Sequence, residues 1–221
     1  MAHAVRAVFP SDPRHIVERA AHPIFDDLAS ALEETATALG ECDLGKAERA
    51  LQKAREMDGR MGAFREALDA GYDTVRLSPP RRRALGQLAL YATAADQLDL
   101  AVRNVRVLAR AAAAAVREGE PAPEALSETV GNLARAVETL SSYIEEPEHP
   151  VETRRFALEA AVGATAVLLE RNDLRTSMLV GQIRSTAVDL LRASGMDSTE
   201  SLEALRKAAK RTTQEPTDQT I

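Results

Sequence analysis

Apolar residues recur at steps of three and four along most of the chain, which is the spacing of one face of an α-helix. The longest such stripe follows Ser78 and ends near Gly119, just before Pro121. Its members are Leu85, Leu88, Ala92, Ala95, Leu98, Val102, Val105, Ala109, Ala112 and Val116. Ser78 is expected to cap this helix, and Pro79 fits its first position, where a missing N–H does no harm. Helices of this length usually belong to a hairpin or bundle.

A second helical pattern begins near Pro13 and ends near Gly40. Ser11 and Asp12 are the candidate N-caps, and Gly40 is the expected C-cap. Pro23 lies inside the pattern, where it should kink or divide the helix. The sequence therefore predicts either one bent helix or two shorter ones in this part of the chain.

Further helical patterns, separated by prolines and glycines, cover about 43–77, 123–144, 151–172, 174–194 and 199–211. Asp173 is the expected cap of the fourth, and Gly59 would weaken or break the first. No convincing β-alternation appears. We therefore expect an all-α, elongated antiparallel helical bundle with long helical hairpins. Residues 1–12 would form an N-terminal junction, 13–211 the bundle with a joint at 145–150, and 212–221 a disordered tail.

Composition supports a helical core and restricts the partners. Hydrophobic residues make up 45% of the chain and aromatic residues only 3%, with no Trp, so the core must be built from Ala, Leu and Val. The net charge of −6 argues against general binding of polyanions, and we expect no nucleic acid partner. Cys42 is the single cysteine, which excludes an intramolecular disulfide. The longest uncharged run, 84–95, is too short to span a bilayer.

Polar residues form a second stripe on the long predicted helix, beside the apolar one. The stripe contains Asp96, Asp99, Arg103, Asn104, Arg106 and Arg110. Asp99 and Arg103 form an acid-before-base pair four residues apart, worth about 0.2–0.5 kcal/mol when exposed. Two interpretations remain open at this stage. The stripe is either a solvated face or a polar packing seam between helices or subunits.

Three consecutive arginines, Arg81, Arg82 and Arg83, fall in the first turn predicted for the same helix. Cations are disfavoured there by about 0.3–1 kcal/mol each, because the helix dipole is positive at its N-terminus. Either a neighbouring helix end carrying Glu66, Asp69 or Asp73 compensates them, or they contact a partner such as anionic lipid headgroups. The three arginines are therefore a candidate lipid or partner contact.

Motifs that would indicate catalysis are weak. The segment 40–46 matches most of a phosphate-binding loop, but Ala47 replaces the Ser or Thr that would hold magnesium, and no strand precedes it. Glu146 and His149 have the spacing of a di-iron bundle ligand pair, but two such pairs are needed. We therefore predict no catalytic, cofactor-binding or metal site and no enzymatic activity.

Three segments carry a family resemblance: Arg76 to Pro79 with the arginines that follow, Leu98 to Arg110, and Val180 to Ser185 with Val188 to Leu191. They resemble the C-terminal cytoplasmic part of actinobacterial aromatic acid exporter proteins, the fusaric acid resistance-like transporters. The segment 7–10, reading AVFP, resembles the junction just after the last membrane helix of that family. The likeness covers residues 4–196, although the family's membrane helices are missing.

The resemblance implies a cytoplasmic domain at the inner face of the plasma membrane, belonging to a transporter of aromatic carboxylic acids or similar organic anions. Its role would be assembly, gating or regulation. The expected partners are the membrane-embedded part of the same transporter, a second copy of the chain and an anionic lipid surface. The alternatives are a free-standing helical adaptor or scaffold, and a phosphate-regulator-like or di-metal helical bundle.

Overall fold

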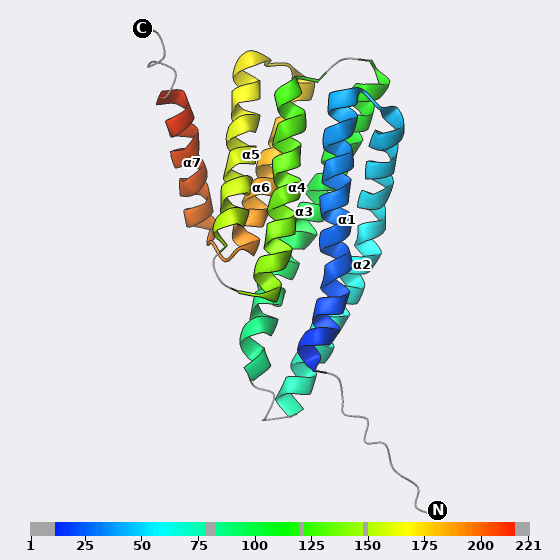
Figure 1. The fold of residues 1–221 in the computed structure, drawn as a ribbon, viewed down its shortest axis with the longest axis vertical. Coiled ribbons are helices and arrows are strands. Elements are labelled where there is room, and N and C mark those ends of the chain that lie inside the picture. Colours follow the sequence, from blue (N-terminus) through cyan, green and yellow to red (C-terminus); the bar gives the residue numbers. More distant parts are fainter. Residues whose placement is uncertain (1–11, 78–82, 120–121, 148–149, 215–221) are drawn as a thin grey trace, which may run out of the picture.

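The computed structural model describes residues 12–77, 83–119, 122–147 and 150–214, with no side-chain description beyond 210. These residues form seven α-helices and no strand, so the all-α prediction is confirmed (Figure 1). The helices are α1 (Pro13–Glu41), α2 (Leu44–Leu77), α3 (Leu85–Arg117), α4 (Glu124–Glu145), α5 (Val151–Glu170), α6 (Leu174–Ala193) and α7 (Ser198–Gln214). The helix α7 ends three residues beyond the predicted end of the bundle, and 215–221 lie outside the description.

Sequence-adjacent helices pack antiparallel in two groups of three (Figure 1). The first group is α1, α2 and α3, and the second is α4, α5 and α6. The groups join where α1 packs on α4 and where α3 packs on α6. The last helix, α7, lies against α5 with a smaller contact to α6. One hydrophobic core draws residues from all seven helices, which gives the elongated antiparallel bundle expected from the sequence.

Of the two alternatives at Pro23, the structure has the single helix, whereas the C-cap predicted at Gly40 and the break predicted at Gly59 are wrong. The helix α1 is not divided at Pro23, because Ile24 and the apolar residues on both sides of the proline are buried in the same core. It ends at Glu41, and Cys42 rather than Gly40 adopts the left-handed conformation, with φ of 53° and its N–H donating to the Ala38 carbonyl. The helix α2 passes through Gly59 without a break, since buried Met57 and Met61 anchor it on either side.

The long predicted helix begins later than expected. The α-helical part of α3 starts at Leu85, after a short 3₁₀ turn at 83–84, whereas Ser78 and Pro79 lie outside the described residues. A residue that precedes a proline disfavours the α conformation, so the consecutive prolines at 79 and 80 are a weak sequence signal for a helix start. Leu85 is 41% exposed, while the stripe from Leu88 to Ala112 is buried or nearly so.

The capping predictions at Asp12 and Asp173 are confirmed. The Asp12 carboxylate accepts a hydrogen bond from the Arg14 backbone N–H at 3.0 Å. The Asp173 carboxylate accepts one from the Thr176 N–H at 2.8 Å. This backbone hydrogen bond, together with the one from the Arg171 side chain, lowers the pKa of Asp173 to about 2. Both caps satisfy backbone donors that a helix start leaves without partners.

Glycine permits close contact between helices at two places in the core. A Cβ atom at Gly163 of α5 would lie 2.8 Å from Thr129 Oγ1 of α4. A Cβ atom at Gly71 of α2 would lie 3.1 Å from a methyl carbon of Val17. With few aromatic side chains to fill space, the bundle reaches a dense core by bringing helix backbones together.

Replacing Gly163 with Ala is therefore expected to destabilise the protein by about 1–2 kcal/mol, because overpacking against Thr129 exceeds the gain in helix propensity. The free energy of unfolding, measured by urea titration, checks this. Gly131→Ala on α4 is the matched control, since nothing lies within 4 Å of a Cβ atom there. That variant should be stabilised by about 0.4–1 kcal/mol.

The double variant Thr129→Ala with Gly163→Ala separates a steric effect from any other consequence of the glycine change. Removing the threonine side chain should recover part of the stability lost by Gly163→Ala. A Gly163→Ala protein as stable as the Gly131→Ala protein would show that the α4–α5 contact is not close-packed.

Candidate functional site

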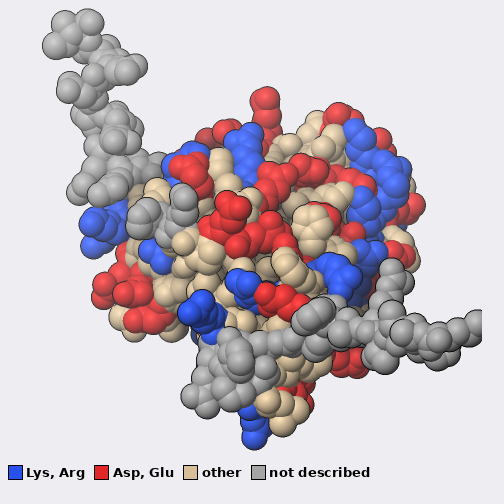
Figure 2. Space-filling view, turned by 60° about the horizontal axis from the view of Figure 1, so that its bottom comes forward, with Lys and Arg blue, Asp and Glu red and all other residues tan. Residues whose placement is uncertain are grey.

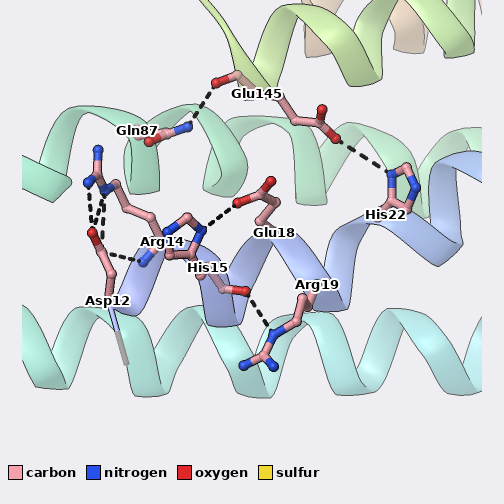
Figure 3. Close-up of polar contacts among 8 residues, drawn as sticks. All are labelled: Asp12, Arg14, His15, Glu18, Arg19, His22, Gln87 and Glu145. Atoms are coloured by element: carbon pink, nitrogen blue, oxygen red, sulfur yellow. Dashed lines mark hydrogen bonds and ion pairs between the residues drawn. The ribbon is translucent and has the colours of Figure 1, made fainter. Parts of the chain in front are cut away.

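One end of the bundle brings together the start of α1, the end of α2, the start of α3 and the end of α4 (Figure 1). Polar contacts join these elements (Figure 3). The Gln87 side-chain amide of α3 donates to the Glu145 backbone carbonyl of α4 at 3.1 Å. The Glu145 carboxylate lies 3.5 Å from His22 Nδ1 of α1. Three helices are thus held in register at this end.

The first turns of α1 carry a chain of local polar contacts (Figure 3). The Arg14 guanidinium donates to both carboxylate oxygens of Asp12, from Nε at 3.2 and 3.1 Å and from Nη2 at 2.7 Å. His15 Nδ1 lies 3.0 Å from a Glu18 carboxylate oxygen, and Arg19 donates to the His15 carbonyl at 3.2 Å. These side chains pair mainly with one another, so the start of α1 is nearly balanced in charge.

A buried phenol lies beneath the same end. Tyr91 of α3 is 1% exposed and packs edge-on against Phe64 of α2, with 6.2 Å between ring centroids. Its hydroxyl group is buried and has no hydrogen-bond partner among the described residues. Burial raises the pKa of Tyr91, and the carboxylates of Glu18 and Glu145 raise it further. The group therefore stays a neutral phenol, and we assign it a packing role.

Of the three candidate arginines, the structure describes only Arg83, while Arg81 and Arg82 lie outside the described residues. Arg83 is exposed and precedes the α-helical part of α3, so the prediction that it occupies the first α-helical turn is wrong. No ion pair joins it to another described residue, and the expected acid Asp73 instead lies 3.9 Å from Arg76. Figure 2 shows acidic and basic side chains interspersed around this end of the bundle.

The polar stripe of α3 divides into an inner and an outer set. The inner set, Asp99, Asn104 and Arg106, contacts neighbouring helices. Asp99 lies 3.5 Å from Arg65 of α2, and Arg106 forms a close ion pair with Asp58 of α2. Asn104 donates to the Asp189 carboxylate of α6 at 2.7 Å. These three residues form a packing seam between helices of the same chain.

The outer set, Asp96, Arg103 and Arg110, faces solvent. Arg103 is paired with Asp99 of its own helix at 2.6 Å, and its side chain is 60% exposed. Asp96 and Arg110 are exposed and have no side-chain partner among the described residues. Both interpretations of the stripe thus apply to different residues, three of which bind neighbouring helices and three of which remain on the surface.

Asp189 was not among the residues singled out from the sequence. It is 6% exposed, and burial raises the pKa of its carboxyl group to about 6 against the opposing effects of Asn104 and Arg192. The available signal was an acid beside the apolar residues Leu190 and Leu191, on the buried face of a helix. Its partner lies 85 residues away, which sequence spacing alone could not indicate.

Features of other site classes are missing from the described part of the chain. No group of three or more His, Cys, Asp or Glu side chains there is arranged to hold a metal ion. Likewise, none of the described helices is both long enough and apolar enough to cross a membrane. The geometry that remains is that of packing seams and exposed polar surfaces.

Comparison with known proteins gives one informative match. The chain is 26% identical over 204 residues to an uncharacterized protein of Corynebacterium glutamicum, and the match covers 87% of the chain and 51% of that relative. The chain thus spans about half the length of the curated relative that it matches. No family model and no solved structure matches the chain.

The buried carboxyl group of Asp189 should make stability depend on pH in a defined direction. Its pKa is higher in the folded chain, at about 6, than the ordinary value of 3.8, so the folded state holds this proton more tightly. Its contribution to the free energy of unfolding is therefore largest at low pH and is lost as pH rises through 6. Asp189→Asn should match wild type near pH 4 and exceed it by about 1–3 kcal/mol above pH 7.

Urea unfolding of wild type and variant across this pH range measures the difference. Asp69→Asn, which changes an exposed acid on α2, is the control and should shift stability by less than about 0.5 kcal/mol at every pH. An Asp189→Asn protein that is less stable than wild type above pH 7 would contradict the cause assigned to the raised pKa.

Proposed function

We propose that this chain is a cytoplasmic domain of a membrane transporter of the aromatic acid exporter class, at the inner face of the plasma membrane. The domain has an assembly, gating or regulatory role and no catalysis of its own. The transported aromatic carboxylic acid or similar organic anion is handled by membrane helices outside this chain. The protein partners of the domain are those helices and a second copy of the domain.

The match over half the length of a longer relative carries this proposal. A domain that aligns over most of its own length with part of a larger protein is suited to being one module of that protein. The helical fold agrees with the resemblance seen in the segments 98–110 and 180–191. The packing seams and the exposed polar surfaces also fit a module that works through contacts.

Chain connectivity supplies a second support. The sequence that resembles a membrane junction, residues 7–10, ends three residues before α1 begins at Pro13. A three-residue connection reaches at most about 11 Å. The arginine cluster directly precedes α3, which begins at the same end of the bundle (Figure 1). The junction-like sequence and the basic cluster are therefore both attached to the end of the bundle where α1 and α3 begin. We propose that this end approaches the membrane.

The native gene product tests the proposal directly. A tag added at the 3′ end of the chromosomal gene should report a protein much larger than this chain, which remains in membranes after alkaline carbonate washing. Deleting the gene should sensitise cells to aromatic carboxylic acids, and the complete gene should restore resistance. A tagged product that has the mass of this chain and stays in the soluble fraction would favour a free-standing helical adaptor.

The basic cluster should contribute to lipid binding. Changing Arg81, Arg82 and Arg83 to Glu is expected to weaken binding to anionic vesicles by at least about tenfold, since each cation near such a surface contributes about 1 kcal/mol. Co-sedimentation with phosphatidylserine-containing vesicles, and with phosphatidylcholine vesicles as the neutral reference, measures it. Circular dichroism should show an intact bundle.

The matched control reverses three exposed cations on α7, namely Arg206, Lys207 and Lys210, and so makes the same change in net charge. This control should bind anionic vesicles much more tightly than the variant in which Arg81, Arg82 and Arg83 are changed to Glu. Equal sedimentation of the wild type and the cluster variant would remove the lipid surface from the list of partners.

A further inference from the structure

The outward stripe of α3 is the strongest unexplained surface of the molecule. It runs through Asp96, Leu100, Arg103, Val107 and Arg110, at alternating steps of four and three residues. Leu100 is 38% exposed and Val107 is partly exposed, so apolar and charged side chains alternate along one line. The helix α3 packs between α2 and α6, which places this line along the middle of a three-helix layer.

The order of side chains in this stripe is self-complementary about Arg103. Leu100 lies three residues before Arg103, and Val107 lies four residues after it. Beyond them, the acid Asp96 lies seven residues before Arg103 and the base Arg110 lies seven residues after it. A contact between two identical chains related by a twofold axis requires a patch that fits itself. An acid and a base at equal distances from a centre meet this requirement only when the two helices run in opposite directions.

We infer that two copies of this chain associate through α3, packed antiparallel, with the twofold axis passing next to Arg103. Asp96 of each copy then pairs with Arg110 of the other, and Leu100 of each lies beside Val107 of the other. A parallel pair would instead oppose Asp96 to Asp96 and Arg110 to Arg110. The charge pattern thus selects both the partner and its direction.

The dimensions of the helix are compatible with this arrangement. Asp96 and Arg110 are 14 residues apart, so the two symmetric ion pairs lie about 21 Å from each other along the helix. Both can close only when the helices cross at the shallow angle of about 20° that is common in bundles. Arg103 meets its own copy at the axis, where the Asp99 carboxylate, 2.6 Å away in each chain, offsets its charge.

Apolar surface on the neighbouring helix extends this face. A groove of about 520 Å³ lies between α3 and α6, with Ala111 and Ala114 of α3 on one side and Leu174 and Met178 of α6 on the other. Leu174 is 80% and Met178 is 52% exposed. In the antiparallel arrangement α6 of each copy lies along the same side as α6 of the other, which would cover part of this surface.

This dimer does not depend on the transporter assignment. When both hold, the twofold axis must lie along the membrane normal, since both copies occupy one membrane. The axis is perpendicular to α3, so in this dimer both bundles would lie along the membrane surface, and each Pro13 end would approach the membrane from the side instead of end-on.

Charge reversal tests the pairing. Sedimentation velocity at low ionic strength should show that the wild-type chain dimerises. Asp96→Arg and Arg110→Asp should each weaken the dimerisation constant by about tenfold or more, because two attractive pairs become two repulsive ones. Mixing the two single variants should restore association, as a one-to-one heterodimer in which both pairs are attractive again. The double variant in one chain should also dimerise.

The controls make the same charge changes elsewhere on the surface. Glu203→Arg and Arg206→Asp on α7 alter exposed residues away from α3 and should leave dimerisation unchanged. A wild-type chain that remains monomeric at several hundred micromolar would overturn the inference. So would single variants that dimerise like wild type, or a mixture of single variants that stays monomeric.

Discussion

Close approach between helix backbones is the constraint on which the structure depends. Aromatic residues make up 3% of the chain, so the space between helices cannot be filled by large rings. Dense packing is reached instead with alanine, leucine and valine side chains, and with glycine at two positions where a Cβ atom would crowd a side chain of the neighbouring helix. Gly163 against Thr129 joins α4 to α5, and Gly71 against Val17 joins α2 to α1. These contacts constrain how the helices pack, and the packing decides which polar side chains can contact each other.

The helix α3 shows how packing decides the role of each polar residue. It contacts helices of both three-helix groups, so two of its faces are closed by neighbours. The polar residues on those faces acquire partners in α2 and α6, whereas the residues between them remain on the surface. A single stripe in the sequence is thereby divided into residues that hold the chain's own helices in register and residues free to meet another molecule.

The sequence predicted correctly those structural features that depend on residues close together in the chain. Helix faces and the caps at Asp12 and Asp173 follow from spacing and from side-chain chemistry within a turn. The failures at Gly40 and Gly59, where the helix continues past the glycine, share one reason, which is that tertiary packing outweighs local propensity. The burial of Asp189 had a local signal in the apolar residues beside it, but its partner Asn104 could not be predicted, because it lies 85 residues away on another helix.

The arrangement in two groups of three helices has a consequence for how the chain folds. Within each group every helix packs on the next one in sequence, so these contacts are local and close rapidly. The contacts of α1 with α4 and of α3 with α6 join segments that lie far apart in the chain, as do the smaller contacts of α1 with α3. Contacts between distant segments form more slowly than local ones, so we expect the joining of the two groups to be slower than the pairing of neighbouring helices, and the hydrogen bond from Asn104 to Asp189 belongs to that slower step.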